Sequence, residues 1–482
     1  MLRDFYKLYN ITLKLIFTLV IVSLLYGCNA IDPLKQAPQA ASKPWKPGKD
    51  IVQEQRYHQE SKELNSITVP EPKLKNKMSL PELIHIALEN SPQTRQTWAI
   101  AQVNAARYGE AQAPYFPSLE VGGVIKAQRN LMRGDREFFE DVIAGPSAGL
   151  TYLLLDFGGR SAEVEQSWQS LLAANWMHNQ QLQDLVYDVT VAYHIFIGRL
   201  YELESAEANL NEAIASLESA QRKRQLGVGT IPDVLLARAR KSQRELDVIN
   251  RSGQLAIARG KLATAIGYSA NTRILVEEPL QSPFLVWEEN DINKIINKAL
   301  EQRPLMASAW ASLYSSEAAV EVAESIMWPT LNLDAGAGWR DVNGNGYSQK
   351  GYIYEGALSI QLPLFEGFSL RNNLKQMQAK VQELRANVEL QQQLIIEEVW
   401  NSYQNLLTAN QRIVASQELL ESATVSYDST LMAYKEGVSQ IVELLQAQST
   451  LADARSELVE ANTLWYIAMI QLTHALGEVP LS

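Results

Sequence analysis

The chain has 482 residues, of which 46% are hydrophobic and 20% are charged, and its single long apolar run argues against a polytopic helical membrane protein. The formal net charge of −11 argues against nucleic acid as a partner. A single cysteine excludes a disulfide framework or a multi-cysteine metal cluster, and the five histidines lack metal-ligand spacing. The sequence therefore predicts neither a bound metal nor a cofactor.

The first 27 residues have the features of a lipoprotein signal peptide. Basic residues precede an apolar stretch over residues 15–25, which is short for a membrane span. The stretch ends in Leu-Tyr-Gly-Cys, which resembles a bacterial lipobox and implies cleavage before Cys28 and lipidation of its thiol and new amino group. The alternative is a free cysteine in an uncleaved anchor. Asn29 stands where aspartate is the usual inner-membrane retention signal, which favours the outer membrane.

Residues 28–78 are predicted to form a lipid-anchored linker. Pro, Lys, Gln and Ser are abundant in residues 31–78, and this composition is typical of an extended tether. We therefore expect the first folded repeat to begin at residue 79.

The rest of the chain is an internal duplication, in which residues 79–270 recur as residues 291–482 after a linker over 271–290. Apolar, glycine and proline positions recur in the same order and at a nearly constant offset. The matched pairs include Ala87-Leu88-Glu89 with Ala299-Leu300-Glu301, Pro92 with Pro304, Pro117 with Pro329, Gly227-Val228 with Gly437-Val438, and Gly267 with Gly477. Two copies of this length indicate halves of one structure.

Each half has the predicted order helix, strand, loop, strand, long helix, tight turn, helix. The long helices are expected over residues 158–224 and 367–435, which contain no proline. The shorter helices are expected over 80–113, 231–267, 291–327 and 441–477. The two shorter helices of each half together match its long helix in length, so we expect them to stack end to end along it. Helices of this length with a narrow apolar seam favour a wall of helices around a lumen.

Four segments alternate apolar and polar residues with the period of two that is typical of strands. They are residues 119–127, 150–154, 331–339 and 352–364. A soluble sheet with one face on a core is the ordinary interpretation of such alternation, but the export signal, the aromatic strand ends and the flanking helices favour transmembrane barrel strands. Four strands cannot close a membrane barrel, which needs about eight. We therefore expect the chain to oligomerise, and three copies would supply enough strands for a closed tube.

Together these features resemble the TolC family of outer-membrane efflux proteins, in its lipoprotein branch. The resemblance covers about residues 79–478 and rests on the duplicated Ala-Leu-Glu-x-x-Pro motif, the Leu-Asp-Phe-Gly-Gly-Arg sequence of residues 155–160, its counterpart at residues 363–367, and the two turn motifs. The second half departs from the family pattern at Phe368-Ser369, where a second glycine is common.

The resemblance implies both a fold and a function. The implied fold is mainly α with a transmembrane β-barrel: a trimeric 12-strand β-barrel continued by a 12-helix periplasmic α-barrel. The implied function is that of the exit duct of a tripartite efflux or type I secretion system. Its implied location is the outer membrane of a Gram-negative bacterium, with outer-membrane lipid, a periplasmic adaptor (membrane fusion) protein and an inner-membrane transporter as partners.

The resemblance also assigns a role to the two turns that follow the long helices. Leu226, Gly227 and Val228 in the first half and Glu436, Gly437 and Val438 in the second are expected farthest from the barrel. In the family, such turns receive the hairpin tips of the adaptor. Their glycines also suit the positive φ that ends a helix, and both roles are compatible.

Three residues near these turns are candidates for a periplasmic gate. Asp233 and Glu443 are equivalent in the two copies, and each lies just inside the helix that follows a turn. A Thr-x-x-Asp capping box gives Asp233 an alternative, structural role. Convergence of the helices, as in the family, implies a ring of three Glu443 carboxylates near the axis. It also implies that Asp233 faces Tyr434 across neighbouring helices. Ser439 and Gln446 stand where relatives carry charged groups, which implies that fewer ionic ties restrain this tip.

Other function classes account for only part of the sequence. A passive porin-like channel would have many strands and no helices of this length, and a structural coiled-coil outer-membrane lipoprotein would leave the four amphipathic strands without a role. An enzyme is disfavoured because no nucleophile, base and orienting group recur together. Asp156-Phe157-Gly158 lacks the accompanying kinase motifs. Residues 341–346 imitate the start of a calcium loop, but an Asn-Gly hairpin between two strands is the better interpretation.

Overall fold

The structure is a computed structural model that describes residues 37–45, 77–131, 138–277, 291–344 and 347–478. The chain divides into two compact units. The first contains residues 102–171 and 317–378, and the second contains residues 38–101, 172–316 and 379–482. Each unit is described by itself below. Because the boundaries fall within helices, α3, α4, α7 and α8 each contribute residues to both units.

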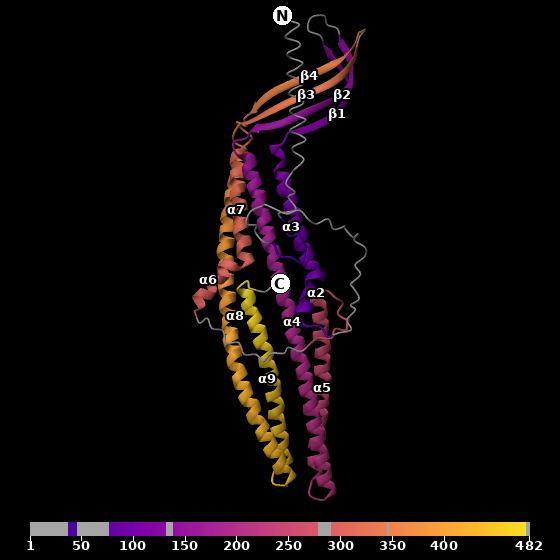
Figure 1. Ribbon diagram of the computed structural model, residues 1–482, viewed down its shortest axis with the longest axis vertical. Helices are drawn as coiled ribbons and strands as arrows, with labels where there is room; N and C mark the ends of the chain where they lie inside the picture. Colours follow the sequence, from indigo (N-terminus) through magenta and orange to yellow (C-terminus); the bar gives the residue numbers. More distant parts are fainter. Residues whose placement is uncertain (1–36, 46–76, 132–137, 278–290, 345–346, 479–482) are drawn as a thin grey trace. The chain divides into compact units, whose positions relative to one another are not determined.

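The first unit is built on a four-stranded antiparallel sheet with the strand order β1-β2-β3-β4 (Figure 1). Its strands are β1 (Ser118–Leu131), β2 (Phe138–Leu155), β3 (Thr330–Gly344) and β4 (Tyr347–Gln361). The four predicted strands are confirmed, although β2 is much longer than its weak alternation indicated. Each repeat supplies one hairpin, and β2 pairs with β3 to join the two repeats. The hairpin between residues 341 and 347 is confirmed by the pairing of Gly344 with Tyr347.

The strand register places the predicted apolar positions on one face of the sheet. Leu119 pairs with Leu150, Tyr152 with Leu333, and Leu333 with Leu358. These positions belong to the alternating sets that the sequence assigned to one side, and many of the larger side chains among them are exposed. The opposite face carries polar groups, where the Thr151 hydroxyl donates a hydrogen bond of 3.1 Å to Asp334. A sheet whose apolar face is open to the surroundings is typical of a transmembrane barrel wall.

A compact polar cluster joins β2 to α4 (Gly159–Gln225). The Arg160 guanidinium donates to the Leu153 carbonyl at 2.8 Å and lies 3.3 Å from the Asp156 carboxylate. The same carboxylate accepts a hydrogen bond of 2.6 Å from the backbone amide of Arg160. Asp156 therefore supports the first turn of α4, while Arg160 binds carbonyls at the end of the strand.

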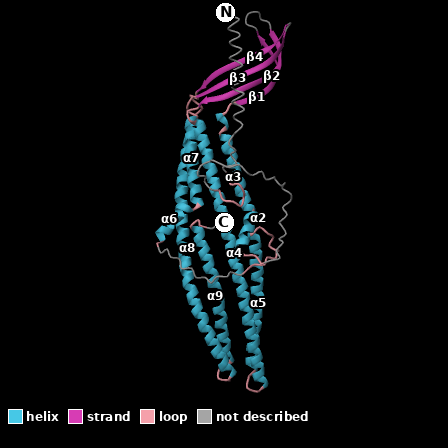
Figure 2. Ribbon diagram, in the orientation of Figure 1, coloured by secondary structure: helices cyan, strands magenta, loops and turns pink. Residues whose placement is uncertain are grey.

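The long helices and the helices after the turns have nearly the predicted bounds, but the helices before the strands do not. The observed helices are α2 (Leu80–Asn90), α3 (Pro92–Ala111), α4, α5 (Ile231–Ala265), α6 (Ile292–Gln302), α7 (Pro304–Ser325), α8 (Ser369–Lys435) and α9 (Ile441–Ala475) (Figure 2). The prediction of continuous helices over 80–113 and 291–327 was wrong. Each breaks at the residue before a proline, Ser91 or Arg303, where the backbone is extended because proline disfavours the helical conformation of its predecessor. Within the described residues, no helix is both long enough and apolar enough to span a membrane.

The hydrophobic core of the second unit explains how short helices line a long one. Buried residues of α2 and of the C-terminal half of α5 pack together against the middle of α4. The end of α5 closely approaches the end of α2, because a Cβ placed on Gly267 would lie 2.8 Å from the Cβ of Asn90. In the second repeat Gly477 approaches Arg303 in the same way. The predicted end-to-end arrangement is thus confirmed only in part: the helices after the turns end at the breaks after α2 and α6, but α2 packs beside the end of α5 and does not extend the stack.

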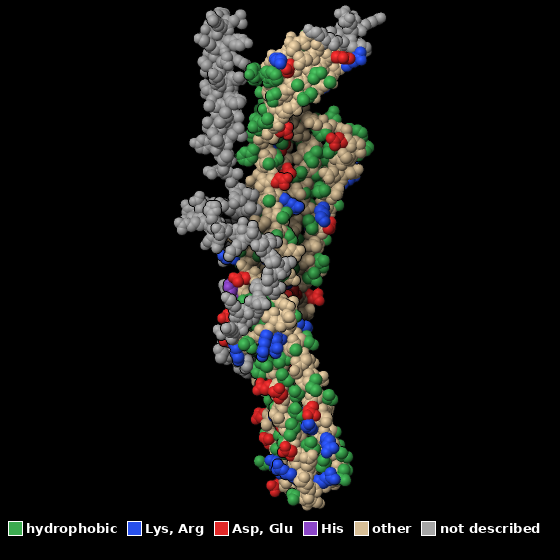
Figure 3. Space-filling view, turned by 90° about the vertical axis from the view of Figure 1, so that its right-hand side faces the viewer, with side chains coloured by type: hydrophobic (Ala, Val, Ile, Leu, Met, Phe, Trp, Pro, Cys, Tyr) green, Lys and Arg blue, Asp and Glu red, His purple; other side chains and the backbone are tan. Residues whose placement is uncertain are grey.

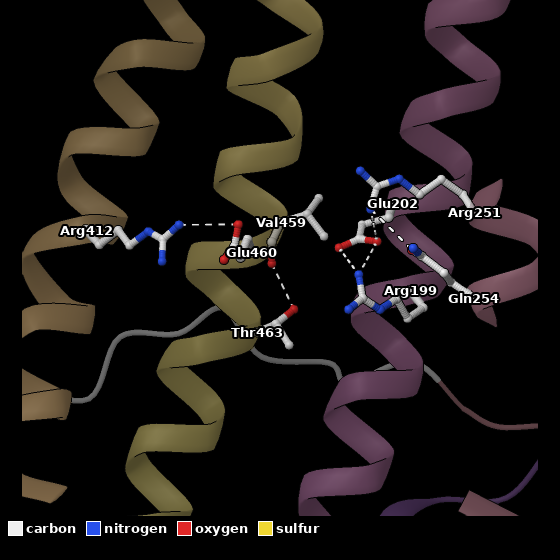
Figure 4. A network of polar contacts seen from close by, with 8 residues as sticks. All are labelled: Arg199, Glu202, Arg251, Gln254, Arg412, Val459, Glu460 and Thr463. Carbon is white, nitrogen blue, oxygen red and sulfur yellow. Dashed lines mark hydrogen bonds and ion pairs between the residues drawn. The ribbon is translucent and has the colours of Figure 1, made fainter. Parts of the chain in front are cut away.

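Ion pairs and hydrogen bonds connect the helices of the second unit. Glu202 of α4 binds Arg251 of α5 at 2.7 Å, and Arg412 of α8 binds Glu460 of α9 at 3.3 Å (Figure 4). Arg412 also binds Glu457 of α9 at 2.6 Å. Glu202 and Arg412 occupy equivalent positions in the two repeats and carry opposite charges, so each long helix is tied to the helix after its turn from the same place. A further set of contacts joins α4 to α9 and thereby one repeat to the other. It comprises Asp184 with His474, Asn209 and Glu212 with Arg455, and Ser216 with Gln448.

Part of the predicted tether, residues 37–45, packs against α3 and α4. The backbone amide of Trp45 donates to the Asn179 side chain at 2.7 Å, and Asn179 donates back to the Trp45 carbonyl at 2.8 Å. The Trp98 indole donates to the Pro38 carbonyl at 2.7 Å. The rings of Trp45 and Trp176 meet edge to face with centroids 5.4 Å apart. Composition indicated an extended segment, and these contacts show that this stretch of it is bound to the helices.

Candidate functional site at the helix-pair turns

The two predicted turns connect α4 to α5 and α8 to α9, and they have the same backbone geometry. Gly227 and Gly437 adopt φ values of 80° and 81°, in the left-handed region that favours glycine. In each turn the next residue donates its amide to a carbonyl of the last helical turn: Val228 to Lys223 at 3.0 Å, and Val438 to Ala433 at 2.9 Å. The structural role proposed for the glycines is therefore confirmed.

Apolar side chains project from both turns. Leu226, Val228 and Val438 are 78%, 75% and 84% exposed, and Glu436 is also exposed. A helix-pair core lies directly behind them, with buried residues from all four helices that meet there. This core includes Ala220 of α4, Val234 of α5, Tyr434 of α8 and Leu444 of α9. The two turns are thus supported by one packed tip.

The helices that follow the turns begin differently in the two repeats. Thr230 and Asp233 form a reciprocal capping box, with the Thr230 amide 3.1 Å from the Asp233 carboxylate and the Asp233 amide 3.3 Å from the Thr230 hydroxyl. In the second repeat Gln440 occupies the N-cap without a side-chain capping bond. Here the Ser439 hydroxyl donates to the Glu443 carboxylate instead. The capping role is therefore confirmed for Asp233, whereas Glu443 is held outside a capping box.

Tyr434 is buried beneath the turns, with 5% of its surface exposed. Burial raises the pKa of its phenol, and the negative charge of Asp233 raises this pKa further. In the part of the chain that the structure describes, the hydrogen bonds of Asp233 are with Thr230, so Asp233 acts on Tyr434 through its charge. The structure therefore brings these two predicted gate residues near one another within a single chain.

One residue of this tip was missed by sequence reasoning. Lys223, near the end of α4, donates a hydrogen bond to the Tyr434 carbonyl and places its ammonium 4.0 Å from the centre of the Tyr434 ring. It lies between Arg222 and Arg224 in a basic run, which is common at helix C-termini and gave no signal of a specific partner. Cys28, the predicted lipidation site, lies outside the described residues.

Comparison with known proteins decides the family. The sequence profile of the outer membrane efflux protein family matches residues 83–268 and 295–478, one match for each repeat. The chain belongs to the outer membrane efflux protein family. This membership confirms the resemblance drawn from the sequence, the predicted role in efflux and the outer-membrane location in a Gram-negative bacterium. The family consists of transport proteins rather than enzymes.

Individual family members are similar along most of their length. Protein CyaE of Bordetella pertussis is 28% identical over 406 residues, which cover 83% of this chain and 84% of the relative. Outer membrane protein TolC of Escherichia coli K12 is 22% identical, with 81% and 80% covered. The outer-membrane channel OprN has a similar fold, with a TM-score of 0.75 at 22% identity over 83% of this chain and 90% of that one. CusC gives a TM-score of 0.72, also at 22% identity, with 83% and 92% covered.

Proposed function

We propose that this efflux protein works as a homotrimer, in which a 12-strand β-barrel continues into a 12-helix α-barrel and forms the exit duct of a tripartite system. The observation that carries the proposal is the four-stranded sheet with an exposed apolar face. In the described residues, neither the outer edge of β1 nor that of β4 has a partner strand. Open edges next to a lipid-facing surface need further strands, because unpaired backbone groups are costly in a bilayer.

The helices support the same assembly. On α8 a row of large apolar side chains is exposed at intervals of seven residues, and α5 carries an exposed apolar row at intervals of eleven residues, both of which return to one side of a helix. The α8 row includes Trp400, Leu407 and Val414, and the α5 row includes Leu235, Leu246 and Ile257. In the proposed trimer these rows pack against neighbouring copies. The alternatives, a passive porin-like channel or a structural lipoprotein, explain the strands or the helices but not both.

The two turns are the proposed docking site for a periplasmic adaptor, which links the duct to an inner-membrane transporter. Their exposed apolar side chains support this role, because such groups are enriched at the centres of protein interfaces. We predict that Val228→Trp with Val438→Trp abolishes export, because bulky rings block close approach of the adaptor. Export by cells and crosslinking to the adaptor measure the effect, and native mass spectrometry tests the trimer. The small-residue control, Val228→Ala with Val438→Ala, should retain export; normal export by the Trp variant would refute docking here.

Glu443, Asp233 and Tyr434 are the proposed gate. Three Glu443 carboxylates at a constriction would attract cations, so Glu443→Gln should reduce cation selectivity in planar bilayers. Tyr434→Phe combined with Asp233→Ala should raise single-channel conductance, because it removes the phenol and the capping carboxylate from the tip. Glu436→Gln removes a nearby exposed charge that lies outside α9, and it serves as the control for the effect of Glu443→Gln on cation selectivity. Wild-type selectivity and conductance in both gate variants would show that these residues only stabilise helix ends.

A further inference from the structure

Lys223 makes a contact that crosses from one repeat to the other at the tip. Its ammonium donates to the carbonyl of Tyr434, in the last turn of α8, and lies over the face of the same residue's ring at 4.0 Å. A cation at a helix C-terminus is favoured by the exposed carbonyls and the helix dipole. The ring face attracts it further. One side chain therefore uses two independent attractions to the same residue.

The neighbouring basic residues do not share this contact. Arg222 is exposed and lies 3.8 Å from Glu218 on its own helix, and Arg224 is exposed. Of this basic run, only Lys223 reaches α8 in the described structure. The contact is therefore set by position on the helix and not by the general charge of the segment.

The contact has no counterpart in the duplicated position. When Gly227 is aligned with Gly437, Lys223 corresponds to Ala433, and Arg224 corresponds to Tyr434. A basic residue of the first copy thus meets an aromatic residue of the second, at places where the copies differ. The side chain of Lys223 on α4 therefore binds α8, and this contact joins the two turns in addition to the apolar core behind them.

We propose that Lys223 is a positioning residue of the gate, which ties the α4–α5 turn to the α8–α9 turn within one chain and restrains opening of the tip. This inference rests on the proposed duct function. It supplies a charge-assisted hydrogen bond and a cation–π contact at a tip where Ser439 and Gln446 carry no charge. When the tie is broken, the end of α8 loses a bound cation and the two helix pairs separate more easily.

The test compares the full-length trimer of wild type with Lys223→Met, which keeps a long side chain but removes the charge. We expect hydrogen–deuterium exchange over residues 217–232 and 423–440 to rise about fivefold, the scale of a lost cation–π contact. Single-channel conductance should rise as well. Arg222→Met is the matched control and should leave both readouts at wild type. Lys223→Arg should restore both, because Arg keeps the charge and stacks on aromatic rings.

Each outcome decides a separate point. Unchanged exchange in Lys223→Met would overturn the tie itself. Faster exchange with unchanged conductance would overturn the restraint on opening and leave the duct function intact. A wild-type trimer that conducts no ions would instead contradict the proposed duct function, while the exchange measurement would still decide whether Lys223 joins the turns.

Discussion

His474 of α9 lies between carboxylates that belong to two other helices. Its Nε2 atom is 2.7 Å from Asp184 of α4, and its Nδ1 atom is 3.6 Å from Glu398 of α8. Glu398 also binds the buried Arg303 at 2.5 Å, and Asp188 of α4 lies close enough to interact with His474. A neutral imidazole has one N–H donor and an imidazolium has two, so only the protonated ring can donate to both carboxylates.

The pKa of His474 reflects this arrangement. Burial alone lowers it, and the charge of Arg303 lowers it further, but the hydrogen bonds to Asp184 and Glu398 and the charge of Asp184 outweigh both and raise the pKa above its usual value. For a base with a raised pKa in the folded state, the stabilisation is full below the unfolded pKa and is lost as pH rises through the folded pKa. His194, which stacks on Tyr466, behaves in the opposite way, because burial lowers its pKa to about 4.

These two histidines predict opposite pH effects. His474→Gln should cost more stability at about pH 5.5 than at about pH 8.5, because the lost interactions belong to the protonated ring. His194→Gln should relieve a penalty of about 1 kcal/mol at the lower pH, where the unfolded chain binds a proton that the folded chain excludes. Thermal unfolding of the solubilised protein at both pH values measures the effects. The same pH slope in wild type and His474→Gln would rule out a charged His474.

At the scale of helices, α4 and α9 are in close contact at a glycine. A Cβ placed on Gly198 of α4 would lie 2.4 Å from the Thr463 hydroxyl of α9. That hydroxyl cannot turn away freely, because it donates to the Val459 carbonyl at 2.8 Å (Figure 4). Gly253 of α5 has open space around its Cβ position. Of these two helical glycines, Gly198 is required by packing and Gly253 is not.

We predict that alanine has opposite effects at these glycines. Gly253→Ala should raise stability by up to about 1 kcal/mol, the gain in helix propensity. Gly198→Ala should lower stability by about 1 kcal/mol, because the forced shift of α9 outweighs that gain. Differential scanning calorimetry of both variants and wild type tests the prediction. An increase in melting temperature for Gly198→Ala would show that the seam between α4 and α9 is loose.

The element pattern could be predicted because the signals are local and occur twice. The alternation of Leu119, Val121 and Ile125 defines an apolar sheet face without any knowledge of the neighbouring strand. Proline shows why the ends of helices were harder to predict. A proline is accepted in the first turn of a helix, but it disfavours the helical conformation of the residue before it, so it can mark either a kink or a break between two helices. Sequence pattern alone did not distinguish a single helix over 80–113 from the observed pair that meets at Ser91.

The contacts of the candidate site could not be predicted in the same way. Lys223 and Tyr434 are 211 positions apart, and His474 and Asp184 are 290 apart. Each pair depends on how two helices are rotated against each other, which no local period specifies. The binding of residues 37–45 was missed for a similar reason, since most of its hydrogen bonds involve backbone atoms, which composition does not reveal. Arg160 stood inside a recognised motif, but its carbonyl partners required the structure.

At the scale of the whole molecule, the charged and apolar surfaces are distributed differently over the parts of the chain. On the face shown in Figure 3, acidic and basic side chains are scattered over the helices, whereas hydrophobic side chains are frequent on the sheet. The exposed apolar strand residues include Val121, Ile125, Tyr354 and Ile360. This distribution suits the proposed duct, in which the sheet lies in lipid and the helices in water.

The lipid anchor is the prediction that belongs to this scale. Cys28→Ser removes the only thiol of the chain, so the mature protein should lose its acyl chains and fractionate less completely with the outer membrane. Mass spectrometry of the purified protein and membrane fractionation measure the two effects. The exposed apolar face of the sheet is unchanged in this variant, so only a partial loss is expected. Unchanged mass and unchanged fractionation would show that Cys28 is not lipidated.

Within the described parts of the chain the four-stranded sheet has two open edges, which also bear on how the protein acquires its stability. If copies close the sheet by pairing β1 of one with β4 of the next, an isolated chain has no complete folded state of its own. Unfolding then separates three molecules as well as disordering each, and the melting temperature rises with protomer concentration. Newly exported chains also meet a kinetic competition, because the same edges that accept the correct neighbour can pair out of register into aggregates.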